Sequence, residues 1–162
     1  MDLARIARHL AVLPGAARRA FPPGSLDAIE KAIREAERTH AGQIRFAVES
    51  ALDLAVLLRG QSARERALEV FSQLRVWDTE HNNGVLIYLL LADRAVEIVA
   101  DRGIHAKTGR QWEEICRAME AELKQGNYER ALTDGIRAVA RHLARHFPGS
   151  QVNELPDKPA VL

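Results

Sequence analysis

The stretch that most constrains the fold is residues 85–91, an apolar run that contains no charged side chain. It is far shorter than the roughly 20 apolar residues that a membrane-spanning helix needs. Asn83 and Gly84 precede the run, and Asp93 and Arg94 follow it closely. A short strand that is apolar on both faces is typical of the centre of a sheet covered by helices. The run therefore predicts an α/β fold with this strand at its centre.

Two further strands are expected beside the central one. Residues 43–49 alternate apolar and polar side chains, which is the period of a half-buried strand. A helix within 62–74 should connect them to the central strand by a right-handed crossover, so the two strands should be parallel. Residues 95–100 follow a tight turn and should form an antiparallel hairpin with the central strand. We predict a three-layer α/β/α sandwich with a small mixed sheet, a parallel βαβ unit followed by an antiparallel hairpin, and helices on both faces.

Helix starts are predicted where a serine, threonine or asparagine precedes residues with a helical apolar period. The predicted caps are Ser25, Ser62, Thr108 and Asn127. Ser62 with Glu65, and Thr108 with Gln111, also have the spacing of a capping box.

The chain is expected to divide into three parts. Residues 1–24 form an amphipathic helix and a connector, 25–148 form the α/β domain, and 149–162 form an extended tail. The apolar face of the first helix consists of Leu3, Ile6, Ala7, Leu10 and Leu13. A basic amphipathic helix can rest on a membrane surface, but we expect this face to pack on its own domain.

The composition excludes several classes of protein. The 162 residues suit a single domain, and the net charge of +1 gives no electrostatic footprint for nucleic acid. Arg5, Arg8 and His9 interrupt any signal-peptide core, and no segment is long enough to cross a membrane. One cysteine excludes an internal disulfide and fits a reducing compartment. We therefore expect a cytoplasmic location.

Polar residues from three separate stretches are expected at one edge of the sheet. The start of a strand lies at the same edge as the start of a parallel neighbour and the end of an antiparallel one. This places residues 39–43, 78–83 and 101–105 together, at an edge that we call the polar rim. Its polar members are Thr39, His40, Gln43, Asp78, Thr79, His81, Asn82, Asn83, Asp101, Arg102 and His105.

The oxygen-rich part of the polar rim is a candidate site for a hard cation. Its side chains are Asp78, Asn82, Asn83 and Asp101. Ca²⁺ and Mg²⁺ prefer carboxylate, amide and carbonyl oxygens. The other interpretation is that these residues form turns and that Asp101 pairs with an arginine. The candidate contacts for a phosphate or other ligand are Arg102, Thr39 and Gln43.

Histidines offer a second kind of metal site. His40, His81 and His105 belong to the polar rim, but their spacing matches no zinc motif, so zinc is not expected. His142 and His146 are four residues apart on one helix. Because they fall in its last turn, we expect them to complement the negative end of the helix dipole.

The opposite edge of the sheet is the alternative site. Glu49 follows the first strand, and Asp93 with Arg94 forms the hairpin turn. Ligands of open α/β sheets often bind beyond the carboxyl ends of the strands. A solvated turn is the other interpretation of these residues.

Nucleophilic and cofactor-dependent catalysis find no support in the sequence. It contains no G-x-S-x-G elbow, no glycine-rich phosphate loop and no H-E-x-x-H motif. Cys116 falls on the apolar face of its helix, where an inert thiol is expected. No organic cofactor is therefore expected.

Three stretches carry a resemblance to a known family. "THAGQIRFAVE", "VFSQLRVWDTEHNNGVLIYLLLADRAVEIVADRGI" and "GNYERALTDGIRAVARHL" resemble the TPM domain. This is the family of the plant thylakoid-lumen acid phosphatase and photosystem II repair proteins, and the chain is similar to its short, soluble bacterial members. The resemblance implies an α/β/α sandwich, acid phosphatase activity in the plant proteins, and Ca²⁺ or Mg²⁺ binding in some members.

The sequence departs from the family pattern at two positions. Gln43 stands where an acidic residue is usual, and Asn82 stands where an aspartate often precedes Asn-Gly, whereas Asp93, Arg94 and Asp101 match the pattern. Fewer carboxylates leave fewer groups to hold a dication or to act as a base.

These observations favour a divalent-cation-binding accessory or protein-interaction domain, with a weak metal-assisted acid phosphatase as the alternative. The expected partner surfaces are the N-terminal helix and the tail, whose segment "NELPDKPAVL" suits an extended conformation in a groove. The other interpretation is that the tail folds back on its own domain or stays mobile.

Overall fold

The computed structural model describes residues 2–104, 111–149 and 151–162. The expected cap Thr108 and the rim residue His105 lie outside these ranges. The helices are α1 Leu3–Leu10, α2 Ala16–Ala20, α3 Pro23–Ala36, α4 Leu54–Leu58, α5 Ala63–Gln73, α7 Gln111–Lys124 and α8 Tyr128–His146. The strands are β1 Gln43–Glu49, β2 Gly84–Leu90, β3 Ala95–Ala100 and β4 Ala160–Val161.

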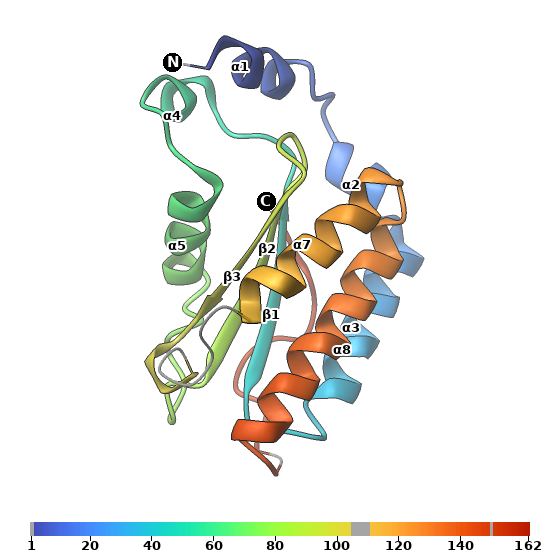
Figure 1. Ribbon diagram of the computed structural model, residues 1–162, viewed down its shortest axis with the longest axis vertical. Coiled ribbons are helices and arrows are strands. Elements are labelled where there is room, and N and C mark those ends of the chain that lie inside the picture. The colour runs from blue at the N-terminus through green and yellow to red at the C-terminus, as the bar shows by residue number, and fades with distance from the viewer. Residues whose placement is uncertain (1, 105–110, 150) are drawn as a thin grey trace.

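The strands form one mixed sheet in the order β3-β2-β1-β4. β1 runs parallel to β2, with Gln43 opposite Gly84, and β2 pairs antiparallel with β3, with Val85 opposite Ala100. Figure 1 shows α5 on the left of the sheet and α3, α7 and α8 on the right. The predicted α/β sandwich, with a parallel unit followed by an antiparallel hairpin, is confirmed.

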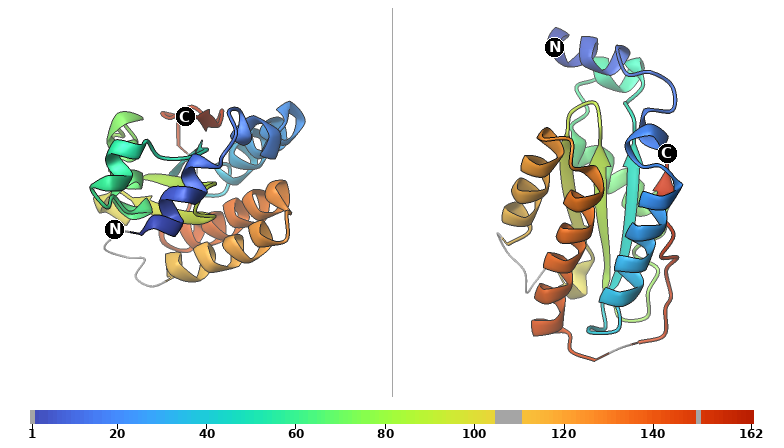
Figure 2. Two further views of the ribbon diagram at one scale, coloured as in Figure 1. Left: turned by 90° about the horizontal axis from the view of Figure 1, so that it is seen from above. Right: turned by 90° about the vertical axis from the view of Figure 1, so that its right-hand side faces the viewer.

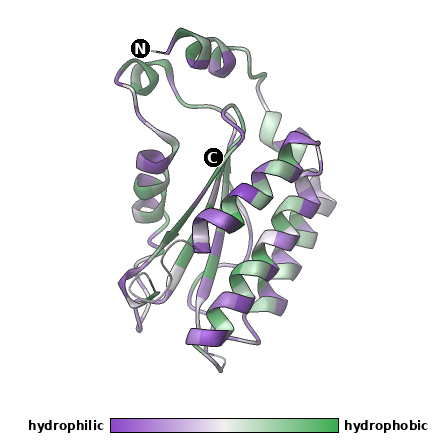
Figure 3. Cartoon of the chain, viewed as in Figure 1, coloured by the Kyte–Doolittle hydropathy of each residue, from purple (hydrophilic) through white to green (hydrophobic). Residues whose placement is uncertain are grey.

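Two cores lie on the two faces of the sheet. Alternate side chains of β2 divide between them: Val85, Ile87 and Leu89 face α3, α7 and α8, whereas Leu86 and Tyr88 face α5. Every residue of β2 is buried, as expected of a central strand. Figure 3 shows hydrophobic colouring along much of the strands and alternating colours along the helices, whose polar faces point to solvent.

The C-terminal tail is part of the sheet. It leaves the end of α8, passes the polar rim and returns along β1, as the right-hand view in Figure 2 shows. Its last residues form β4, which pairs parallel with β1 through Ala47 with Ala160 and Val48 with Val161. The tail thus closes the β1 edge of the sheet.

The N-terminal helix does not bury the expected face. Leu3, Leu10 and Leu13 are 68%, 65% and 68% exposed, whereas His9 is 3% exposed. Of the predicted inward face, Ile6 is half-buried and packs against the core on the α5 side, but the leucines stay exposed because polar contacts of His9 and Arg5 with the hairpin turn orient α1. The helix nevertheless contacts its own domain through α4.

Two predicted helix caps also differ from the structure. α3 begins at Pro23, so Ser25 lies in its first turn and donates from its hydroxyl to Oε2 of Glu129 at 2.6 Å. Asn127 does precede α8, but its side chain makes no cap bond and donates instead to Glu122 at 2.8 Å. The capping box of Ser62 is confirmed at the start of α5.

Candidate functional site at the polar rim

Backbone hydrogen bonds join the three stretches of the polar rim. The carbonyl of Asn83 accepts from the N–H of Gln43 at 3.0 Å, and the carbonyl of Asn82 accepts from Gly103 at 3.0 Å. The start of β1, the segment before β2 and the segment after β3 therefore meet, as the strand directions predicted.

The chain path at this junction depends on two unusual residues. Asn82 has a φ of 51°, in the left-handed region that asparagine tolerates better than most residues. A Cβ atom on Gly103 would lie 2.6 Å from the Asn82 carbonyl oxygen and 2.8 Å from that of His81. A glycine is therefore required for the two segments to approach this closely.

Asp101 is the acidic residue buried at the rim. It is 8% exposed, and its Oδ1 accepts the backbone N–H of Arg102 at 2.7 Å. Its Oδ2 is buried and has no hydrogen-bond partner among residues 2–104, 111–149 and 151–162. Asp101 and Arg102 line an open hollow of about 420 Å³ between β3 and α5, together with Arg64 and Phe71. A buried carboxylate oxygen without a donor is unfavourable, because the protein does not replace the water it has lost.

Asn83 lies on the β1 side of β2. It is 2% exposed, and its amide nitrogen donates to the Ala41 carbonyl at 2.5 Å and to Oε1 of Gln151 at 2.9 Å. Its Oδ1 is buried and finds no hydrogen-bond donor in the part of the chain that the structure describes. Within that part, the polar rim therefore contains a second buried oxygen that lacks a donor.

The other predicted ligands are in different surroundings. Asp78 is exposed and forms an ion pair with Arg75 at 2.5 Å, and Asn82 is half-buried. Thr39 is exposed and donates to the Ala36 carbonyl at 2.7 Å, which caps the end of α3.

Gln43 holds the tail. Its Oε1 accepts from the backbone N–H groups of Glu154 and Leu155 at 2.8 and 3.3 Å, and its Nε2 donates to the Val152 carbonyl at 3.5 Å. It is 2% exposed. The amide of Gln43 thus bonds main chain through both its oxygen and its nitrogen.

His40 and His81, the rim histidines that the structure describes, are in different surroundings. His40 is 1% exposed, and burial lowers its pKa to about 4, whereas His81 is exposed. His142 and His146 have ring centroids 4.9 Å apart, and burial lowers the pKa of His142. Within residues 2–104, 111–149 and 151–162, no three histidine, cysteine, aspartate or glutamate side chains gather as a metal-binding group.

At the opposite edge, the acidic side chains already have internal partners. Glu49 accepts from Arg66 at 2.8 and 3.0 Å and from the Tyr88 hydroxyl at 2.7 Å. Burial, with the bond to Glu49, raises the pKa of Tyr88.

Asp93 has a similar set of internal partners. It is bound by Arg5 at 2.8 Å and by His9 at 3.0 Å. Arg94, beside it in the hairpin turn, is exposed. The carboxylates of this edge are occupied by structural contacts.

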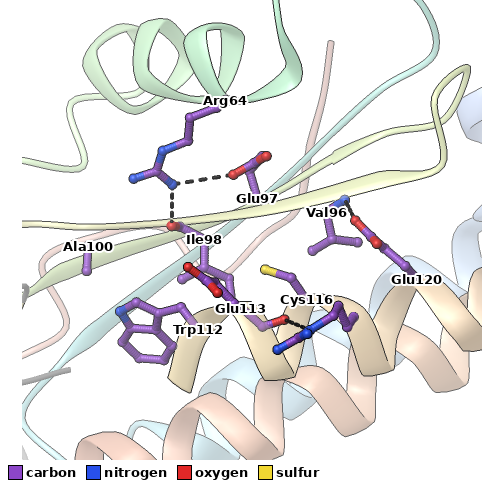
Figure 4. A pocket seen from close by; sticks show the side chains of 10 residues that line it. Arg64, Val96, Glu97, Ile98, Ala100, Trp112, Glu113, Cys116 and Glu120 are labelled. Carbon is purple, nitrogen blue, oxygen red and sulfur yellow. Dashed lines mark hydrogen bonds and ion pairs between the residues drawn. The ribbon is translucent and has the colours of Figure 1, made fainter. Parts of the chain in front are cut away.

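A further hollow, of about 540 Å³, lies along β3 between α5 and α7 (Figure 4). Two of its polar side chains bond the outward edge of the strand: Oε1 of Glu120 accepts from the Val96 N–H at 3.0 Å, and Arg64 donates to the Ile98 carbonyl at 2.7 Å. Cys116 is also in its wall, and burial raises the pKa of this thiol to about 12. Glu120 and Arg64 in this hollow therefore hydrogen-bond backbone groups at the outward edge of β3.

The sequence comparison with protein families gives one match. The description of the matching family model is "TPM domain", and it covers residues 18–142, from within α2 to within α8. The chain belongs to the TPM domain family. The predicted resemblance is therefore confirmed.

Solved structures agree with this assignment. The NMR structure of the BA42 protein from the psychrophilic bacterium Bizionia argentinensis is 32% identical, with a TM-score of 0.74 over 86% of this chain and 93% of that one. The N-terminal domain of a protein from P. gingivalis is 17% identical, with a TM-score of 0.63 over 93% of each chain, and shares the fold. Among curated proteins, none matches.

No helix in the described parts of this TPM domain is long and apolar enough to span a membrane. Sequence reasoning missed the contacts of the TPM domain with its own tail, above all those of Glu37, Arg45 and Asp157. In the sequence, these contacts with the tail were indicated only by Gln43 and Arg45, two polar residues that alternate with apolar residues along the predicted strand.

Proposed function

We propose that this TPM domain is an accessory domain that binds a divalent cation at the polar rim, with Asp101 as its charged ligand. The observation that carries the proposal is the buried, unpartnered Oδ2 of Asp101. A cation would compensate the buried charge, and carboxylate, amide and carbonyl oxygens suit Ca²⁺ and Mg²⁺.

The neighbours of Asp101 support this position. Asn82 and Asn83 bring amide and carbonyl oxygens to the same junction, and the Asn83 Oδ1 also lacks a donor. Among the described residues, the other buried acid, Asp157, pairs with Arg34, and the half-buried Glu49 and Asp93 also have arginine partners. With a single carboxylate, the bound ion would keep several waters, so the dissociation constant should be on the order of 1 mM.

The test is an amide NMR titration of the metal-stripped chain with CaCl₂ and MgCl₂. The proposal predicts saturable shifts centred on residues 78–84 and 101–104, which disappear in Asp101→Asn. This variant keeps an acceptor for the Arg102 N–H but removes the charge. Asp134→Asn, on the exposed face of α8, is the matched control and should titrate like the wild type. Equal shifts in both variants, or none at millimolar cation, would refute the site.

A metal-assisted phosphatase is the second candidate, favoured by one observation. Arg64 and Arg102 line the same hollow as Asp101, so guanidinium groups adjoin the proposed cation. Arginine and a metal ion together stabilise charge on a transferring phosphoryl group.

Hydrolysis of an aryl phosphate tests this candidate separately from ion binding. Activity should persist through purification and be lost in both Asp101→Asn and Arg102→Ala. If Arg102→Ala still binds the cation but neither the wild type nor any variant hydrolyses the aryl phosphate, the accessory-domain proposal stands and the phosphatase is ruled out.

A further inference from the structure

The contacts of the tail recognise main chain more than side chain. Gln43 bonds the N–H groups of Glu154 and Leu155. Arg45 donates through Nη1 to the carbonyl of Lys158 at 2.7 Å and also to that of Pro156. Two side chains of β1 thus hold an extended segment by its backbone. Such contacts depend on the path of the segment, and little on its sequence.

The direct strand pairing of the tail is short. β4 contains only Ala160 and Val161, and beyond it the N–H of Leu162 donates to the Val48 carbonyl at 2.9 Å. A two-residue ladder contributes only a few hydrogen bonds to the sheet. The tail is therefore the segment of the sheet that separates most readily from it.

A pair of acidic side chains lies between the tail and the end of α3. Oε1 of Glu37 accepts the N–H of Ile44 at 2.7 Å, and the Glu37 carboxyl is also hydrogen-bonded to Asp157 of the tail. Asp157 is 8% exposed. Two carboxyl groups can form this bond only when one of them carries a proton.

The surrounding charges place that proton on Glu37. Oδ2 of Asp157 lies 3.4 Å from Nε of Arg34, and Asp157 also interacts with Arg45 of β1, so both cations adjoin the Asp157 side of the pair. Its Oδ1 also accepts from the side-chain amide of Asn153 at 2.7 Å. Burial, followed by the proximity and hydrogen bond of Asp157, raises the pKa of Glu37 to about 8 against the lowering effect of the Ile44 bond.

We propose that residues 152–162 are a releasable strap over the edge of β1, which the proton between Glu37 and Asp157 locks in place. Loss of the proton leaves two facing carboxylates and detaches the segment. Release uncovers the backbone edge of β1 and the amide of Gln43 at the polar rim. The strap operates without an ion, so this inference is independent of the proposed cation site.

The direction of the pH effect follows from the raised pKa. The docked strap retains a proton that the free Glu37 carboxyl loses near its ordinary pKa of 4.5. Docking is therefore strongest below 4.5, weakens as the pH rises toward about 8, and stays weak above that value. One proton limits the change to about tenfold per pH unit.

Native-state amide exchange of the whole chain tests the strap. The readouts are the protection factors of the Leu155 and Leu162 amides, which correct for the intrinsic effect of pH on exchange. Both protection factors should fall about tenfold between about pH 6 and about pH 8. This fall is smaller than the limit that one proton sets, because Glu37 is partly solvated. Amides in β2 should keep their protection.

Two variants test whether the proton between Glu37 and Asp157 holds the strap in place. Glu37→Gln keeps the acceptor for Ile44 and donates permanently to Asp157, so its strap should stay protected at both pH values. In Asp157→Asn the new amide donates permanently to Glu37, so the strap of this variant should also stay protected at both pH values. This variant remains informative if Glu37→Gln fails to fold. Glu35→Gln, exposed on α3 and paired with Lys31, is the matched control and should show the wild-type fall. A pH-independent wild type, or a wild-type fall in Glu37→Gln and Asp157→Asn, would overturn the proposal.

Discussion

His9 and Asp93 are 84 residues apart in the sequence, and Nε2 of His9 lies 3.0 Å from Oδ1 of Asp93. The other ring nitrogen, Nδ1, accepts the N–H of Leu52 at 2.9 Å, so Nε2 carries the proton that is donated to Asp93. One side chain of α1 thereby bonds both the loop after β1 and the β2–β3 turn.

Replacement of Asp93 by asparagine should lower the free energy of unfolding by about 2–3 kcal/mol, because Arg5 and His9 lose a buried anionic partner. The midpoint of urea unfolding measures this loss. Asp134→Asn removes an exposed ion pair instead and should change stability by less than about 0.5 kcal/mol. Equal losses in the two variants would contradict the assigned role of Asp93.

The Asp93 carboxylate should also make the free energy of unfolding depend on pH in the acid range. Burial alone would raise the pKa of Asp93, but the hydrogen bonds from Arg5 and His9 outweigh it and hold the pKa below 3.8. Its contribution is therefore present above pH 3.8 and lost as the pH falls through the lowered pKa. The stability difference between wild type and Asp93→Asn should shrink on acidification. A difference that grows in acid would mean that the pKa is raised.

Gly84 should not tolerate a side chain. A Cβ atom there would lie 2.0 Å from the backbone oxygen of Val76, whereas a Cβ on Gly24 meets nothing within 4 Å. Gly84→Ala should lower stability by about 3 kcal/mol, as overpacking in a core does. Gly24→Ala lies in α3 and should leave stability equal or raise it by about 0.5 kcal/mol. Thermal or urea unfolding compares the two, and equal stabilities would show that the packing at Gly84 can relax.

Cys116 should be unreactive in the folded chain. Burial raises its pKa to about 12, so the thiolate that attacks electrophiles is scarce at neutral pH. A chromogenic disulfide reagent should modify it slowly in buffer and rapidly in denaturant. Rapid native labelling would indicate that the wall formed by α7 opens.

Asn82→Asp should strengthen cation binding at the polar rim. The change adds a carboxylate beside Asp101, and aspartate tolerates the left-handed backbone that Asn82 adopts. A second carboxylate should tighten binding of Ca²⁺ by about tenfold. Calorimetric titration measures the affinity. Gln125→Glu adds the same charge at the exposed end of α7 and should have no effect; an equal gain there would reveal only a general charge effect.

The fold and the meeting of the rim segments could be predicted because both follow from local periodicity. Alternation in 43–49 and the apolar run of β2 determine the strands, and strand direction brings Asn83 to Gln43. The side-chain contacts could not be predicted in this way. The amide of Asn83 reaches Gln151, 68 residues away, and Gln43 reaches Glu154, 111 residues away. These pairs depend on where the tail returns, which no local pattern encodes.

The orientation of α1 illustrates the same limit. Its apolar period correctly indicated a helix, but the partner of His9 comes from a turn far along the chain. The two hydrogen bonds of the buried His9 determine the orientation of α1, although Leu3, Leu10 and Leu13 stay exposed in it.

The two edges of the sheet are closed in different ways, and this bears on how the chain behaves at high concentration. Along β3, Glu120 and Arg64 already occupy outward backbone groups of Val96 and Ile98, so this edge offers a poor template for the strand of a neighbouring molecule. The β1 edge is covered by the tail and by Oε1 of Glu37, which accepts the N–H of Ile44. Self-association through strand addition should therefore begin at β1, and conditions that loosen the last residues should be those in which the protein aggregates.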